Sequence, residues 1–138
     1  MSTIKGEKLM RDILFKGKRI ANNEWIYGSL IQGNECSSIW NDEIKDDVEV
    51  YSDTIGQFTD MYDKNNVRVF ENDIVKCLID GCEKVGLVKF DYWSFGIVIG
   101  EMAERFVPLE RLDYDTDYFE VIGNFFDNPE LMEIENYT

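Results

Sequence analysis

The chain has 138 residues, of which 44% are hydrophobic, and a formal net charge of −14 from 14 basic and 28 acidic side chains. This length indicates one domain, or two small lobes that share a core, and the hydrophobic content is sufficient for a sizeable core. Binding to nucleic acid requires Lys and Arg to displace counterions from phosphates, so the charge argues against direct nucleic-acid binding. The absence of His removes Ser-His-Asp and Cys-His catalysis and the commonest zinc ligand.

The charge is unevenly distributed along the chain. Residues 1–20 contain six Lys or Arg residues against two acidic ones, a balance of +4. The remaining residues contain eight basic and 26 acidic groups, a balance of −18. We interpret the basic segment as a strand or tail that contacts the acidic remainder of the same molecule. A nucleic-acid-binding arm is the less favoured alternative, because no larger basic surface follows.

The location of the protein is inferred from features that the sequence lacks. No apolar run approaches the roughly 20 residues that a membrane-spanning helix needs. Residues 1–6 lack the apolar region of a signal peptide. The three cysteines, Cys36, Cys77 and Cys82, are an odd number for a disulfide framework. We therefore expect a reduced cytoplasmic protein with no membrane partner.

The N-terminal part is expected to be a β subdomain that covers residues 1–60. Its strands are predicted at 11–18, 24–31, 48–51 and 54–59, with a turn at Asn22-Asn23. Residues 33–47 are polar and irregular in pattern, and they are predicted to form a long loop. The segment 24–31 is apolar on both faces and has no Lys, Arg or Pro to protect a strand edge, so it is a candidate for self-association.

The C-terminal part, residues 61–138, is predicted to form a small, bent antiparallel barrel. Closely spaced strands are expected at 74–79, 85–90, 95–99, 106–109 and 118–124, and Pro108 indicates that the fourth is an edge strand or that Pro108 lies at a strand end. Five of their side chains are expected to be mostly buried, namely Ile74, Val88, Phe90, Ile97 and Val121. Residues 128–132 are predicted to form a short C-terminal helix, with Asn128 at the N-cap and Pro129 in the first turn. The predicted fold class is therefore mainly β.

The cysteines and acidic clusters give no metal site or catalytic centre. No second close pair accompanies Cys77 and Cys82, so both are expected to be buried thiols, whereas Cys36 is a candidate exposed thiol. Three aspartates, Asp113, Asp115 and Asp117, have the spacing of the start of an EF-hand loop, but Tyr118 and Asn124 occupy the positions that require Gly and Glu. A solvated acidic loop is favoured over a weak calcium site. We expect no catalytic residue, no metal and no cofactor.

Two glycines and several aromatic residues have either a structural or a binding role. Neither Gly56 nor Gly123 belongs to a phosphate-binding motif, so both are interpreted as architectural, at a bulge or a close backbone approach. The aromatic residues are too numerous for one small core, and aromatic side chains are enriched at interfaces. Core burial is the default for any single one of them. The candidate interaction residues are Trp25, Tyr27, Trp40 and Trp93.

Five short motifs, in order along about four-fifths of the chain, carry a family resemblance. They are Trp25-Ile26-Tyr27-Gly28, 54–60, Asp63-Lys64-Asn65, 70–75 and 120–131. On these motifs the chain resembles the YopX family of bacteriophage and prophage proteins. The family usually has Gly where this chain has Asn66 and Asn72. Asn tolerates a positive φ better than most residues, so the turns are expected to persist.

The resemblance implies a β-rich phage protein of the host-cell cytoplasm whose C-terminal part is an SH3-like barrel, and it transfers no catalytic residue. The favoured function is a non-catalytic protein–protein interaction or assembly module with a phage or host protein partner, and homo-oligomers are possible. An acidic phage protein that occupies the basic surface of a host nucleic-acid-binding protein is the alternative. An enzyme that uses carboxylates such as Glu71, Asp73 or Asp91 is least favoured.

Overall fold

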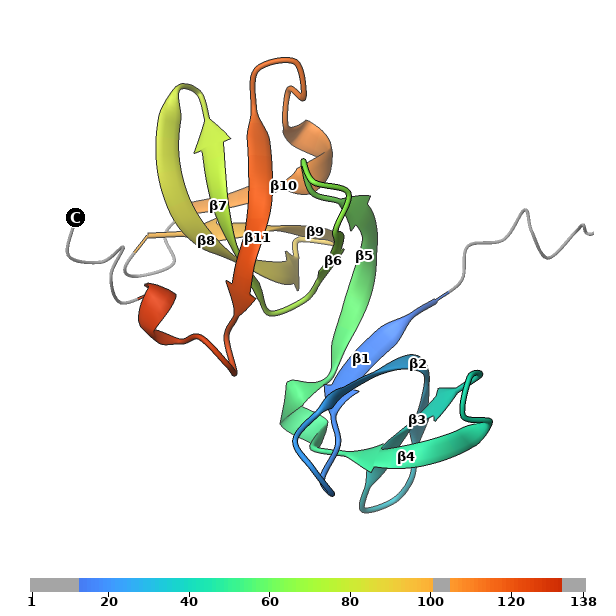
Figure 1. Ribbon diagram of the computed structural model, residues 1–138. Coiled ribbons are helices and arrows are strands. Elements are labelled where there is room, and N and C mark those ends of the chain that lie inside the picture. Colours follow the sequence, from blue (N-terminus) through green and yellow to red (C-terminus); the bar gives the residue numbers. More distant parts are fainter. Residues whose placement is uncertain (1–12, 101–104, 133–138) are drawn as a thin grey trace, which may run out of the picture. The chain divides into compact units, whose positions relative to one another are not determined.

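The computed structural model describes residues 13–100 and 105–132, and within them the chain is mainly β. It forms two compact units whose boundary lies between Gln57 and Phe58, inside the strand β5 (Gly56–Tyr62) (Figure 1). The sequence had placed this boundary between residues 60 and 61. The strand β5 pairs with β1 through its first residues and with β6 further along, so both units use it.

The first unit is built from β1 (Phe15–Lys18), β2 (Trp25–Gln32), β3 (Ser37–Asn41), β4 (Asp46–Val50), the 3-10 turn η1 (Ser52–Thr54) and the start of β5. From β1 to β4 each strand pairs antiparallel with the next, and β1 also pairs antiparallel with β5. Alternate side chains point to opposite faces of a strand, which places one side of each strand in the core. The core consists of Ile26, Ile39 and Val50, with Phe15, Leu30, Val48 and Ile55 packed against it.

The segment 33–47 is not the loop that its composition predicts. It contains β3 and the start of β4, joined by a tight turn. Ile39 is fully buried, so one apolar residue on the inner face anchors an otherwise polar strand. The Asn41 side chain accepts hydrogen bonds from the amides of Glu43 and Ile44 at 2.9 and 3.0 Å, which stabilises the turn. The polar residues reflect an exposed sheet face rather than an irregular loop.

A glycine explains how closely β2 and β3 approach each other. A Cβ atom added at Gly28 would clash with the carbonyl oxygen of Trp40. The end of β4 also approaches the end of β1. Arg19 and Val50 form an antiparallel β-bridge, and the amide of Tyr51 donates to the carbonyl of Lys18 at 2.9 Å. The bridge is isolated, and it does not close a barrel.

The second unit contains β6 (Arg68–Phe70) and a five-stranded antiparallel sheet. The sheet strands are β7 (Asp73–Ile79), β8 (Cys82–Asp91), β9 (Ser94–Ile99), β10 (Arg105–Pro108) and β11 (Tyr118–Asn124), and η2 (Leu109–Arg111) follows β10. The strand order is β10-β9-β8-β7-β11. The strands at the two ends of this order, β10 and β11, do not pair with each other. The sheet is therefore open, and the expected barrel is not closed. The strand β10, which contains Pro108, lies at an edge, as predicted.

The core of the second unit confirms most of the expected burial. Ile74, Val88 and Ile97 are fully buried, and Val121 is half-buried against the same core. Phe90 is 50% exposed, so its predicted burial is wrong. It shares a face of β8 with Val88, but it lies beyond the end of the core and packs on Phe95 instead, with ring centroids 5.0 Å apart.

The cysteines and the C-terminal turn differ in detail from expectation. Cys77 is buried and Cys36 is exposed, as expected, but Cys82 is exposed because it starts β8 directly after a turn. Residues 130–132 are helical. The side chain of Asn128 does not cap this helix. Its Oδ1 atom accepts a hydrogen bond from the amide of Asn124 at 3.2 Å, and a Cβ atom at Gly123 would lie 2.5 Å from the same oxygen.

The loop after η2 contains a phenol with a raised pKa. The Tyr114 hydroxyl donates a hydrogen bond to the carbonyl of Leu109 at 2.8 Å. Partial burial of this side chain, which is 47% exposed, raises the pKa of Tyr114 from 10.0 to about 12, with a smaller contribution from the negative charge of Asp117. Because the folded state holds this proton more tightly than the unfolded chain, the phenol contributes stability that is fully present below pH 10.0 and is lost as the pH rises through about 12.

We therefore expect Tyr114→Phe to flatten the decline in stability between pH 10 and pH 12. The free energy of unfolding is measured by urea titration at several alkaline pH values. Tyr62→Phe is the control, because Tyr62 is 48% exposed, about as much as Tyr114 at 47%, but its hydroxyl makes no hydrogen bond within the described residues. This variant should keep the wild-type slope. Equal alkaline slopes for wild type and Tyr114→Phe would contradict the assignment.

Candidate interaction site

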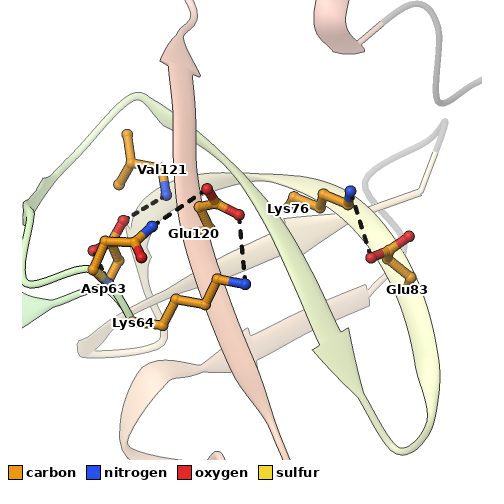
Figure 2. Close-up of polar contacts among 7 residues, drawn as sticks. Asp63, Lys64, Lys76, Glu83, Glu120 and Val121 are labelled. Carbon is orange, nitrogen blue, oxygen red and sulfur yellow. Dashed lines mark hydrogen bonds and ion pairs between the residues drawn. The ribbon is translucent and has the colours of Figure 1, made fainter.

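The buried carboxylate of Asp63 has a structural role. Its Oδ1 atom accepts hydrogen bonds from the amides of Asn65 and Val67 at 2.8 and 2.9 Å. Its Oδ2 atom accepts one from the amide of Val121 in β11 at 2.9 Å (Figure 2). One side chain thus satisfies three backbone donors and holds the loop after β5 against β11. A carboxylate whose oxygens are occupied in this way stabilises the scaffold, because buried amides need acceptors.

A second set of motif residues shapes the approach to β7. The side chain of Asp73 accepts a hydrogen bond from the amide of Phe70 at 2.8 Å. Asn66 and Asn72 have φ values of 67° and 75°, so both adopt the left-handed conformation expected where the family has Gly. The backbone of Asn72 donates to the carbonyl of Val88 and accepts from the amide of Phe125, both at 2.8 Å. The residues that carry the family resemblance therefore determine backbone geometry.

The charged pairs nearby are surface interactions. Lys64 lies 3.7 Å from Glu120, and Lys76 lies 3.6 Å from Glu83 (Figure 2). Their side chains are 35% to 52% exposed, and pairs of this kind contribute about 0–1 kcal/mol each. They supply no catalytic constellation.

The acidic loop after η2 is held by its own backbone. The carboxylate of Asp117 accepts hydrogen bonds from the amides of Asp80 and Asp113 at 3.3 and 3.1 Å. In residues 13–100 and 105–132, no group of three or more His, Cys, Asp or Glu side chains is arranged to hold a metal ion. The aspartates of this loop thus support a turn.

Three of the four predicted interaction residues lie in the first unit. Trp25 and Tyr27 share one face of β2, and Trp40 lies on the same face because it pairs with Ser29. The ammonium group of Lys16 lies 4.6 Å from the ring centroid of Trp25. The indole nitrogen of Trp40 donates to Asp42 at 2.8 Å. These aromatic side chains are therefore partly engaged within their own unit.

Trp93, in the second unit, is the most exposed of the large hydrophobic residues in the described part of the chain, at 94%. It lies with Tyr92 in a two-residue turn that Asp91 and Ser94 close between β8 and β9. The φ values of Tyr92 and Trp93 are 48° and 67°. Such hairpin turns normally contain Asn-Gly, because a left-handed conformation costs other residues about 1–2 kcal/mol each. Two bulky aromatic residues are therefore held in an unfavourable conformation and directed into solvent.

A groove lies beside this turn, and we call it the tip groove. It has a volume of about 580 Å³ and is lined by Tyr92, Trp93, Ser94, Phe106, Pro108, Glu110 and Arg111. The ring of Tyr92 packs against that of Phe106 with centroids 5.4 Å apart. Leu109, the first residue of η2, is buried and anchors this turn, whereas Glu110 and Arg111 are exposed. The groove thus combines three aromatic rings and a proline with one charge of each sign.

The sequence predicted one residue of this groove, Trp93, and did not predict the residues on its other side. Trp93 was predicted because aromatic residues were in excess. Phe106, Pro108, Glu110 and Arg111 were not singled out as site residues. Their proximity to Trp93 depends on the register of β9 with β10, in which Pro108 pairs with Gly96. The only sequence signal is the aromatic pair inside a predicted turn, a position where Asn and Gly are usual.

The fold and the site define a mainly β protein whose motif residues build the scaffold and whose aromatic turn borders a groove. The sequence model of the family described as YopX protein matches residues 14–133. The chain belongs to this family. The search of curated proteins found no match. Within the described residues, no helix is long and apolar enough to cross a membrane.

Relief of backbone strain should make Trp93→Gly more stable than the wild type. The free energy of unfolding is expected to rise by about 1 kcal/mol, because Gly adopts a positive φ without steric cost and the exposed indole contributes little packing. Phe95→Gly, in the same hairpin, removes a side chain that packs on the core and should lower stability. Urea denaturation measures both variants, and a destabilised Trp93→Gly would show that the turn is not strained.

Replacement of the buried carboxylate should have a large effect on stability. Asp63→Asn exchanges an acceptor oxygen for a donor that faces backbone amides, and we expect a loss of about 2–4 kcal/mol. Asp115→Asn removes the same charge at an exposed position of the same unit and should change stability by less than about 0.5 kcal/mol. Thermal and urea denaturation provide the measurement. Similar effects of the two substitutions would indicate that net charge, rather than the hydrogen bonds, is responsible.

Proposed function

We propose that this phage or prophage protein is a non-catalytic protein–protein interaction module that acts in the host-cell cytoplasm through its tip groove. The observation that carries the proposal is Trp93, 94% exposed on a turn whose φ values are unfavourable for aromatic residues. A residue held at a cost to stability is often retained for function. Tryptophan and tyrosine are also the residues that most often dominate binding energy at protein interfaces.

The chemistry of the chain supports a binding role over an enzymatic one. It contains no His. The carboxylates of Asp63 and Asp73 are buried and accept hydrogen bonds from backbone amides. Asp91, the exposed member of the carboxylates considered for catalysis, accepts a hydrogen bond from the amide of Tyr92. Each of these groups has a structural function that explains its presence.

The net charge of −14 favours a second candidate, in which the protein occupies the basic surface of a host nucleic-acid-binding protein. That mode of binding would weaken steeply with added salt, because screening shortens the reach of electrostatic attraction. We also propose that the second unit resembles an SH3-like fold and that the protein self-associates through β2. The open five-stranded sheet is compatible with the first. For the second, β2 lies between β1 and β3 and is not the edge strand that the sequence argument assumed, so the exposed side chains of Tyr27 and Ile31 support association through its face instead.

Affinity capture with matched variants tests the proposed function. The tagged wild type, Trp93→Ala and Trp40→Ala are used on extracts of a host that carries the phage or prophage, at low and high salt. We expect a partner that the wild type and Trp40→Ala retain and that Trp93→Ala loses. Loss with Trp40→Ala alone would move the interface to the first unit. A partner that only salt releases, with no effect of Trp93→Ala, would favour the acidic competitor.

A further inference from the structure

We propose that the tip groove binds an extended, proline-rich peptide segment that carries a basic residue. The inference rests on the proposed function and specifies the chemistry of the partner. The groove is lined by the rings of Tyr92, Trp93 and Phe106 and by Pro108, together with the polar residues Ser94, Glu110 and Arg111. Polyproline II segments dock in aromatic-lined grooves of this kind, because their rings pack on aromatic faces.

An extended proline-rich segment also fits the energetics of such a groove. Its φ angles are already restricted, so binding costs less conformational entropy than binding of a flexible peptide. The groove itself is held in place from several sides. A Cβ atom at Gly96 would lie 2.5 Å from the ring of Phe106, so glycine permits this ring to approach β9 closely. The carbonyl of Leu109 accepts hydrogen bonds from the Tyr114 hydroxyl at 2.8 Å and the Leu112 amide at 3.4 Å, which fixes η2.

The charges of the protein select a cationic peptide. The net charge of −14 attracts basic segments, and the exposed carboxylate of Glu110 is available at the groove for an ion pair. Arg111 also lines the groove and opposes a cationic ligand. The two neighbouring charges therefore have opposite expected effects, so substitutions at the two positions reveal the sign of the ligand charge.

A second copy of this chain fits the groove less well. Two copies repel each other through their like net charge of −14. The chain has only two prolines, Pro108 and Pro129, and Pro108 already lines the groove. It therefore contains no proline-rich segment that could occupy the groove of a neighbour.

Fluorescence titration of the full-length protein tests the proposal, because Trp93 lies in the groove and reports on its environment. The probes are a synthetic polyproline peptide with arginines at one end, the same peptide with glutamates, and a Gly-Ser peptide with the same arginines. We expect saturable binding of the first, and affinity for the other two lower by about tenfold or more. Failure of the arginine–polyproline peptide to bind, or equal binding of all three, would overturn the proposal.

Variants locate the site and determine the sign of the ligand charge. Because Trp93→Ala removes the reporter, the variants are titrated by following a label on the peptide. We expect Trp93→Ala and Phe106→Ala to weaken binding about tenfold or more. Glu110→Gln should weaken it severalfold, whereas Arg111→Gln should strengthen it. Circular dichroism confirms folding, and Trp40→Ala should bind as the wild type.

The outcomes separate the ligand from the proposed function. The reverse signs at Glu110 and Arg111 would refute a cationic ligand, and unchanged binding by Trp93→Ala would refute the location. Self-association that light scattering detects in the absence of peptide, and that Trp93→Ala abolishes, would identify a second copy as the occupant. If a partner is captured in a Trp93-dependent way but no polyproline peptide binds, the peptide class is wrong and the proposed function remains.

Discussion

The second unit depends on one buried carboxylate that satisfies backbone donors from two distant parts of the chain. Asp63 accepts from Asn65 and Val67 in its own loop and from Val121 in β11. The neighbouring amide of Lys64 donates to the carbonyl of Phe119 at 3.1 Å, so the loop is fixed to the outer edge of β11 by backbone bonds as well. Without this attachment β11 would present unpaired polar groups, which invite association with other strands. The loop therefore defines one side of the sheet.

Positive φ values separate positions that serve the scaffold from those that need another explanation. Apart from glycines, the described residues with positive φ are asparagine, aspartate, lysine and two aromatic residues. Asn66 and Asn72 adopt this conformation at low cost and restrict the unfolded chain more than Gly would. No comparable local reason accounts for Tyr92 and Trp93, which lie together at the most exposed turn and border the groove. The positive φ values of these two aromatic residues therefore mark the candidate site independently of its charge.

Most of the fold could be predicted from local signals, whereas the site could not. The turn pair Asn22-Asn23 separated two predicted strands correctly, and the left-handed Asn66 and Asn72 followed from the chemistry of asparagine. Predictions failed where tertiary position decides the outcome. The segment 33–47 was predicted as a loop but contains a strand, because Ile39 is buried in the core. Phe90 was predicted to be buried but lies beyond the end of the core. The groove combines the turn between β8 and β9 with β9, β10 and η2, and no sequence pattern gives the register that brings them together.

The location of the boundary inside β5 affects how the molecule can be divided. Gly56 and Gln57 pair with β1, whereas Phe58 and Tyr62 pair with β6. Cleavage between the two units would cut one continuous strand and leave each fragment without the remainder of it. Each fragment would then end in a truncated edge, a form prone to fraying or to pairing with foreign strands. Because both units use this strand, recombination between relatives should exchange the two units together or at points outside the strand.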